Sequence, residues 1–258
     1  MKKYTVGIDS GSTMCKGIVF DGEKIVDSMV TETGWNSKES ALLCLQTLLD
    51  RNEIEEAAIE VISTGYGRET IDFADRTLTE ISCHALGGVY LEPQVEAVID
   101  IGGQDSKIIK IQKGKAVSFH MNDKCAAGTG RFLEMACLRL GIELENIDEF
   151  ITTDEGVTIN SMCAVFAESE IIGLLAAGTD RSLILRGVIR SIASKVGNMI
   201  GRAGCDDCNV FLMTGGLARS RKIVEEIEKS IGKKVMTVEN SQFAGAIGAG
   251  VHGFGDLK

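Results

Sequence analysis

The sequence predicts an α/β fold made of two similar halves, each a sheet flanked by helices, and three observations lead to this prediction. First, an apolar strand ending in Asp, a tight glycine turn and a second strand occur twice along the chain. Second, strand-like and helical segments are mixed in both halves, which is typical of α/β architectures. Third, no low-complexity linker separates the halves, so we expect them to pack directly around a cleft. The matched positions are Asp9 with Asp100, Gly11 with Gly102 and Lys16 with Lys107.

The first half is expected to cover residues 1–95. Apolar alternation predicts three strands within residues 4–31, followed by a helix around Lys38–Leu49. A further strand, Ala57–Ser63, leads into Thr64-Gly-Tyr-Gly67, and helical stretches are expected near 69–91.

The second half is expected to cover residues 96–258. It restarts at Ala97 with the repeated hairpin, and a glycine-rich segment at its end is able to form a closely packing helix. This last helix is expected to pack back on the first half. The remaining elements are a strand over Ala116–Met121, a helix beginning after Cys125 and running to about Gly141, helices over Val165–Ala177 and about 182–203, a strand over Asn209–Met213, a helix over about 219–231, and the small-residue helix Phe243–Gly250.

The composition and charge of the chain argue against several classes of function. The 258 residues are 44% hydrophobic and 25% charged, as in globular proteins, and no apolar run approaches the roughly 18 residues of a membrane span. The apolar stretch near the start breaks at Asp9, so we expect no signal peptide and a cytoplasmic protein. A net charge of −10 argues against nucleic acid as a partner, because neutralising phosphates requires clustered Lys and Arg. A membrane partner is not expected either.

The repeated turns favour phosphate binding. A glycine turn lets backbone N–H groups approach phosphate oxygens, and an Asp at a strand end can hold Mg²⁺ through water. Two such turns facing each other would bind a polyphosphate from both sides. Two ordinary hairpins are the alternative, but the repetition of Asp, Gly and Lys at one offset argues against it.

Three more motifs accompany the turns: Thr64-Gly-Tyr-Gly67, Met213-Thr-Gly-Gly-Leu-Ala218 and Ala244-Gly-Ala-Ile-Gly-Ala249. In this order the five motifs resemble the phosphate, connecting and adenosine motifs of the actin, hexokinase and Hsp70 ATPase superfamily. The resemblance implies two ribonuclease H-like halves that open and close around ATP and Mg²⁺. Because the superfamily includes kinases, chaperones, filament formers and redox ATPases, the fold does not settle the function.

Eight cysteines are many for a chain expected in a reducing compartment. Cys125 and Cys163 each precede a predicted helix, where the positive end of the helix dipole favours a thiolate. Two thiolates from each subunit of a symmetric dimer would complete a [4Fe-4S] site. Zinc with two outside ligands and a redox-active dithiol are alternatives. Of the other cysteines, Cys44 and Cys137 are expected to be buried small hydrophobes, Cys15 and Cys83 structural, and Cys205 with Cys208 a rival donor pair in a polar loop.

The segments around these two cysteines carry the most specific sequence motif of the chain. The block Met121-Asn-Asp-Lys-Cys-Ala-Ala-Gly-Thr-Gly-Arg-Phe132, the stretch Val165-Phe-Ala-Glu-Ser-Glu170 and both turns closely resemble the activator component of 2-hydroxyacyl-CoA dehydratases and the related ATPase subunits of benzoyl-CoA reductase. The resemblance covers essentially the whole chain. It implies that Cys125 and Cys163 from two subunits hold one bridging [4Fe-4S] cluster. Cys205-Asp-Asp-Cys208 departs from the family pattern.

The resemblance also implies a role for each site residue in an ATP-dependent one-electron donor. A homodimer would receive electrons from ferredoxin or flavodoxin and pass them to a dehydratase or reductase component. A small-molecule kinase on the same fold is the runner-up, and a scaffold ATPase a third reading. The expected assignments are Asp9 and Asp100 for Mg²⁺, Ser12, Thr13, Lys16, Gly102 and Gly103 for phosphates, Gln104 and Asp105 near the γ-phosphate and attacking water, Gly215 and Gly216 for adenosine, and Gln242 beside the nucleotide. Asp105 is alternatively a simple turn residue.

Overall fold

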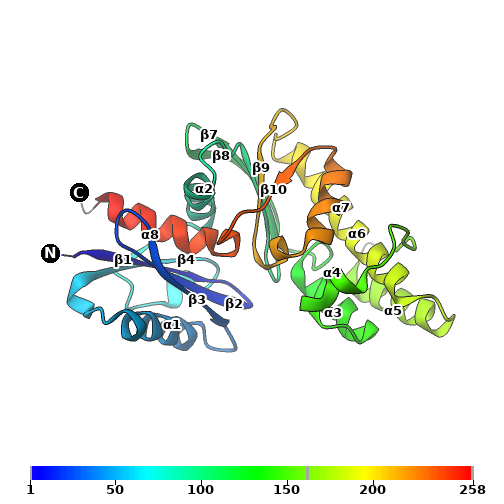
Figure 1. Cartoon of the computed structure of the whole chain (residues 1–258), viewed down its shortest axis with the longest axis horizontal. Helices are drawn as coiled ribbons and strands as arrows, with labels where there is room; N and C mark the ends of the chain where they lie inside the picture. The colour runs from blue at the N-terminus through cyan, green and yellow to red at the C-terminus, as the bar shows by residue number, and fades with distance from the viewer. Residues whose placement is uncertain (1, 161–162, 257–258) are drawn as a thin grey trace. The chain divides into compact units, whose positions relative to one another are not determined.

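The first sheet has the strand order β3-β2-β1-β4-β5 in the computed structural model, which describes the backbone of residues 2–160 and 163–256 (Figure 1). β1 pairs antiparallel with β2 and parallel with β4. β1 and β4 are almost wholly buried, because helices cover both faces of the sheet. The strands are β1 (Tyr4–Ser10), β2 (Met14–Phe20), β3 (Ile25–Glu32), β4 (Ile59–Thr64) and β5 (Arg76–Thr77).

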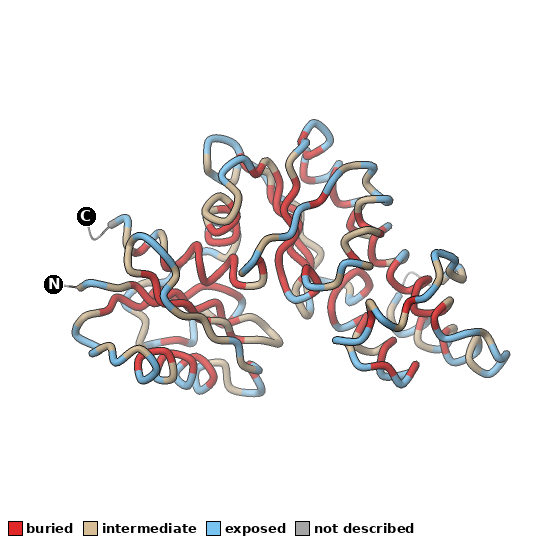
Figure 2. Tube along the Cα trace, viewed as in Figure 1, coloured by how far each residue is buried: buried red, intermediate tan, exposed pale blue. Residues whose placement is uncertain are grey.

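Three helices form the outer layers of this sheet. On one face α1 (Ser37–Asn52) contributes Cys44 and Leu48 to a core with Val6 and Ile8 of β1. On the other face lie α2 (Glu80–Leu91) and α8 (Ala244–Asp256), which pack against each other. The buried trace in Figure 2 runs through these layers and leaves the outer helix faces exposed.

Glycines allow α8 to lie directly on its neighbours. A Cβ atom on Gly7 of β1 would stand 2.0 Å from the carbonyl oxygen of Ala246, and one on Gly87 of α2 would stand 1.9 Å from that of Ala244. Both distances are far below van der Waals contact, so only glycine fits. The expectation that the small-residue helix packs closely against backbone is confirmed.

The second sheet has the order β10-β9-β6-β7-β8. Short strand β10 pairs in parallel with β9 and was not expected from the sequence, because two residues carry no readable alternation. The strands are β6 (Ala97–Ile101), β7 (Ser106–Gln112), β8 (Lys115–Asn122), β9 (Phe211–Thr214) and β10 (Val235–Met236). The accompanying helices are α3 (Gly130–Leu140), α4 (Ile147–Phe150), α5 (Ala164–Ala176), α6 (Arg181–Arg202) and α7 (Arg221–Ile231).

The chain divides into two compact units. One contains the chain up to Val98, Ile109–Ser118 and the chain from Val238 on, and the other contains Ile99–Ile108 and Phe119–Thr237. The first sheet with α1, α2 and α8 belongs to the first unit, and α3 to α7 belong to the second. Across the described residues, no helix is long and apolar enough to cross a membrane.

The helical stretches expected near 69–91 are a single 3₁₀ turn at Arg68–Thr70 and α2, which begins where Thr79 caps it, with β5 between them. One helix prediction needs correction, because the helix expected to have Cys125 at its threshold begins at Gly130. Gly128 has φ +92° and Thr129 is extended, and neither conformation continues a helix.

Candidate functional site

The first Asp-Gly turn connects β1 to β2 and presents polar groups at its tip. Asp9 is buried at the end of β1, opposite Lys16 in the β1–β2 register, and the Gly11 N–H donates to the Met14 carbonyl at 3.1 Å. Ser12, Thr13 and Lys16 are half-buried. The Thr13 hydroxyl is buried and has no hydrogen-bond partner among the described residues. An orphaned buried hydroxyl at such a turn is expected where a ligand supplies the missing partner.

Two glycines and a histidine surround the Asp9 carboxylate within the first unit. A Cβ on Gly65 would stand 2.4 Å from Asp9 Oδ1, and one on Gly245 would stand 2.5 Å from Oδ2. These glycines belong to the two connecting motifs read from the sequence, so both motifs meet at Asp9. His84 of α2 is also buried here, with Nε2 3.9 Å from Asp9 Oδ2. Sequence reasoning missed His84, because its position one helix away carries no local signal.

The second turn is held by a buried network of charges. Lys107 is only 1% exposed, and its Nζ lies 2.8 Å from Asp105 Oδ2 and 3.4 Å from Asp100 Oδ2. The Thr214 hydroxyl donates to Asp100 Oδ1 at 2.7 Å. The network brings Asp100 and Asp105 together, while Gln104 projects outward at the tip and is exposed. The alignment of Lys107 with Lys16 was the signal that could have placed this lysine in the site.

The second turn is also hydrogen-bonded to the segment that follows Cys125. The backbone N–H groups of Gly130 and Arg131, at the start of α3, donate to the carbonyls of Gly102 and Gly103 at 2.9 and 2.8 Å. The Ser106 hydroxyl donates to the Gly128 carbonyl at 2.5 Å. The two bonds from Gly130 and Arg131 satisfy N–H groups that a helix start leaves without partners.

The Gly-Gly turn after β9 contains two glycines in unlike environments. Gly215 has φ +84°, and a Cβ there would stand 2.3 Å from the Ile101 carbonyl, so this position requires glycine for packing. A Cβ on Gly216 would meet nothing within 4 Å. Gly216 borders a small cavity of about 160 Å³, which also contains Arg219 and, from the segment before α4, Glu145. Gln242 lies half-buried in the 3₁₀ turn Ser241–Phe243, in the first unit.

The cysteines fall into two groups. Six are buried, Cys163 is exposed, and Cys125 is half-buried. Burial raises the pKa of both Cys83 and Cys137 to about 12, which keeps these thiols protonated and unreactive at neutral pH. The burial expected of Cys44 and Cys137 is confirmed.

Cys163 is the N-cap residue of α5 as expected, although Ser161 and Met162 before it lie outside the described residues. Cys125 lies in the loop before α3, five positions from its first residue, so the expectation that it stands at the helix threshold is wrong. Cys205 and Cys208 lie in a loop after α6, as expected, with exposed Asp206 and Asp207 between them, but both cysteines are buried. Among the described residues, no three His, Cys, Asp or Glu side chains gather as one chain's metal site would require.

Residues 6–253 match the model of the BadF/BadG/BcrA/BcrD ATPase family. The (R)-2-hydroxyglutaryl-CoA dehydratase activating ATPase of Acidaminococcus fermentans is 38% identical over 257 residues, covering 98% of both chains. The activator of the 2-hydroxyisocaproyl-CoA dehydratase from Clostridium difficile, solved with bound ADPNP, superposes with a TM-score of 0.92 at 35% identity, covering 98% of this chain and 95% of that one.

A more distant structure bears on the fold alone. The ROK hexokinase from Thermus thermophilus has a TM-score of 0.54 at 15% identity, with 99% of this chain and 100% of that chain covered. The predicted α/β fold of the actin, hexokinase and Hsp70 type is therefore confirmed, as is the resemblance to dehydratase activators. The chain belongs to the BadF/BadG/BcrA/BcrD ATPase family.

Proposed function

We propose that this protein is an ATP-driven one-electron donor that activates an enzyme of the 2-hydroxyacyl-CoA dehydratase type. Membership of an ATPase family supports the use of ATP. The observation that carries the electron-transfer part of the proposal is the difference in burial among the cysteines. Of the eight, only Cys125 and Cys163 are accessible. Both belong to the second unit and both precede a helix.

The accessible thiols fit one half of a [4Fe-4S] site. Such a cluster takes four cysteine ligands, and two copies of the chain would supply Cys125 and Cys163 twice. Cys163 has no side-chain capping bond in its own chain, which leaves its sulfur available as a ligand. When bound, the cluster would accept and release one electron at a time.

The surface of α5 supports a homodimer around these thiols. Ala167 and Ile171 face the core of the second unit, whereas Val165, Phe166 and Ile172 are exposed. Val165 and Phe166, two and three positions after Cys163, are both 69% exposed. Large apolar side chains gathered on one helix face are typical of an interaction surface. A second copy placed here would cover them and bring its own cysteines to the same place.

The nucleotide roles follow the two turns. Asp9 and Asp100 would organise Mg²⁺, and Ser12, Thr13, Lys16, Gly102 and Gly103 would contact phosphates. Gln104 and Asp105 would lie near the γ-phosphate and the attacking water, with Gly215, Gly216 and Gln242 beside the nucleoside. The orphaned Thr13 hydroxyl and the cavity at Gly216 support these assignments.

A physical connection between nucleotide and cysteine supports coupling. The carbonyls of Gly102 and Gly103 accept the first N–H groups of α3, and Ser106 holds Gly128. A change in the second turn on ATP binding would therefore move the segment that follows Cys125. Hydrogen bonding and exposure around the sulfurs are the means by which such a movement would change the reduction potential. ATP can bias the change only by binding one conformation better than the other.

The partners we propose are a dehydratase or reductase component as electron acceptor and ferredoxin or flavodoxin as donor. A small-molecule kinase on the same fold is the alternative. The kinase needs a substrate pocket with a general-base Asp in the first unit and gives Cys125 and Cys163 no role.

Anaerobic reconstitution with iron and sulfide separates these functions. We expect a brown dimer with about four iron atoms, and loss of iron in Cys125→Ala and Cys163→Ala with ADP binding retained. Cys208→Ala is the matched control, because it removes a buried thiol of the rival pair. A colourless wild-type protein, or full iron in both variants, would refute the proposal. Phosphorylation of a sugar or acid would support the kinase instead.

A further inference from the structure

A cavity of about 880 Å³ in the second unit contains none of the residues assigned to the nucleotide or the cluster. Its walls are the end of β8 with the loop that follows it, the segment Gly156–Asn160, and one face of α6. The volume falls in the range of sites that hold small organic ligands.

The cavity is cationic in an acidic protein. Lys124, Arg190, Lys195 and Arg202 border it, and Asp123 is the one carboxylate among its described lining residues, although the chain carries a net charge of −10. Such a local reversal of sign raises the concentration of anions at a concave site.

Three of these cationic side chains have no ion-pair partner among the described residues. Lys124, Lys195 and Arg202 make no hydrogen bond or ion pair there, whereas Arg190 is held by Glu226, with Nε 3.3 Å from Oε1. Lys195 is half-buried because its stem packs over Gly128, where an added Cβ would stand 2.8 Å from Lys195 Cγ. A partly desolvated ammonium group gains more from an anion than one in open water.

The rest of the α6 face is suited to hydrogen bonding. Ser191, Ser194, Lys195, Asn198 and Arg202 recur at helical spacing and therefore share one side of α6. Hydroxyl and amide groups beside cations form the usual chemistry of phosphate and carboxylate recognition.

The opposite walls are fastened by hydrogen bonds. Asn122 Nδ2 donates to the carbonyls of Cys125 and Ala127 at 2.8 and 3.2 Å, which fixes the loop after β8. The Val157 N–H donates to the Leu183 carbonyl at 3.1 Å, and Asn160 donates twice to Glu170 of α5 at 3.0 Å. The cavity is thus a built site with walls from four segments.

We propose that this cavity is a second anion-binding site, separate from the nucleotide site, for a small ligand that carries at least two negative charges on phosphate or carboxylate groups. Lys195 and Arg202 provide the charge, and Ser194 and Asn198 orient the ligand. The occupant lies between the segments that lead to Cys125 and Cys163, so it is placed to act as an effector.

The test is calorimetric titration of the full-length protein without a cluster, saturated with ADPNP and Mg²⁺ so that the nucleotide site is filled. Inorganic pyrophosphate and citrate are the probes. We expect at least one of them to bind with a Kd below about 1 mM at low salt, and more weakly as salt rises. Lys195→Gln and Arg202→Gln should each weaken binding about 10-fold or more.

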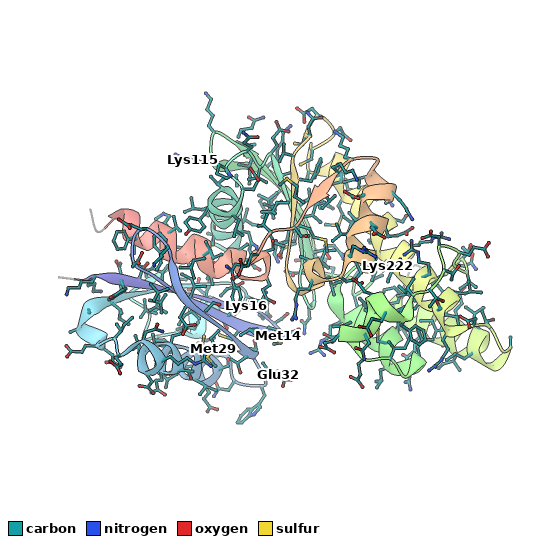
Figure 3. All side chains as sticks on the ribbon, in the orientation of Figure 1. Met14, Lys16, Met29, Glu32, Lys115 and Lys222 are labelled. Carbon is teal, nitrogen blue, oxygen red and sulfur yellow. The ribbon has the colours of Figure 1, made fainter. Side chains whose placement is uncertain are left out.

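Lys115→Gln is the matched control, since Lys115, at the start of β8 (Figure 3), is exposed and does not line the cavity. Binding of neither probe, or equal binding by wild type and both cavity variants, would overturn the proposal. So would binding of only a glutamate-rich peptide, which would mark a docking site for an acidic protein. Because no cluster is present, failure here would leave the proposed electron transfer untouched.

Discussion

The two Asp-Gly turns share a sequence pattern but use their lysines differently. In the second turn Lys107 is buried between Asp100 and Asp105, whereas in the first turn the aligned Lys16 is half-buried and makes no ion pair with a described residue. One sequence difference accompanies this contrast: Asp105, which pairs with Lys107, aligns with Met14. Figure 3 shows Lys16 with Met14 on β2, and Met14 pairs with Glu32 across β2 and β3.

The two lysines therefore have different expected roles, Lys107 in holding its own turn together and Lys16 in the proposed contact with a ligand. Lys107 neutralises two carboxylates inside its own unit, so its charge is already used. Lys16 makes no ion pair with a described residue, so its ammonium group remains available for the proposed phosphate contact. A repeated motif therefore does not imply repeated roles, and each of the following predictions changes one member of the pair.

The largest effect is expected from Lys107→Ala. It leaves Asp100 and Asp105 buried or half-buried beside each other without their cation, which should lower the free energy of unfolding by about 3–5 kcal/mol. Lys16→Ala is the matched variant and should cost no more than about 0.5 kcal/mol. Urea denaturation followed by circular dichroism measures both. Equal losses in the two variants would show that the turns are alike after all.

Thr214→Val tests the other support of Asp100. The valine keeps the shape of threonine but removes the donor to Asp100 Oδ1, a buried carboxylate. We expect a loss of about 1–3 kcal/mol in the same denaturation experiment. Ser12→Ala, on a half-buried turn residue, should leave stability within about 0.5 kcal/mol. A neutral Thr214→Val would mean that water replaces the hydroxyl.

The contrast between the turns also explains what the sequence could predict. The hairpins and the central Asp residues follow from local alternation and glycine turns, and the structure has them where expected. The burial of Lys107 depends on Thr214 and Asp100, which are far apart in sequence, so no local pattern reports it.

The missed features have similar causes. The start of α3 is delayed by the backbone of Gly128, whose positive φ is one of several conformations open to glycine. Cys205 and Cys208 are buried although polar residues flank them, because the turn after α6 packs inward. Whether a short polar segment is buried depends on tertiary packing, so it cannot be predicted from the composition of the segment.

Met14→Asp should make the first turn behave like the second. The new carboxylate would occupy the position of Asp105 and pair with Lys16, removing its charge from the nucleotide. We expect ADP affinity to fall about 10-fold by titration calorimetry, equivalent to about 1.4 kcal/mol. Met14→Leu preserves the apolar residue and should bind ADP as wild type does. Wild-type affinity in Met14→Asp would remove Lys16 from the proposed phosphate contacts.

The smallest effect concerns pH and again compares aligned positions, Cys15 beside the first turn and Ser106 beside the second. A hydrogen bond with Cys44, together with burial, raises the pKa of the Cys15 thiol far above its ordinary value of 9.0. The unfolded chain therefore loses this proton first. The stability that the protonated thiol contributes is complete below pH 9 and declines as the pH rises beyond it.

Between pH 9 and 10 this decline should amount to roughly 1 kcal/mol, so Cys15→Ala should show a correspondingly shallower alkaline slope of unfolding free energy than wild type. Ser106 has no proton to lose in this range. Ser106→Ala should therefore lower stability by a constant amount, because it removes the hydrogen bond to Gly128, and leave the slope unchanged. Parallel curves for wild type and Cys15→Ala would mean that Cys15 ionises as easily in the folded protein as in the unfolded chain, which its burial and its bond with Cys44 should prevent.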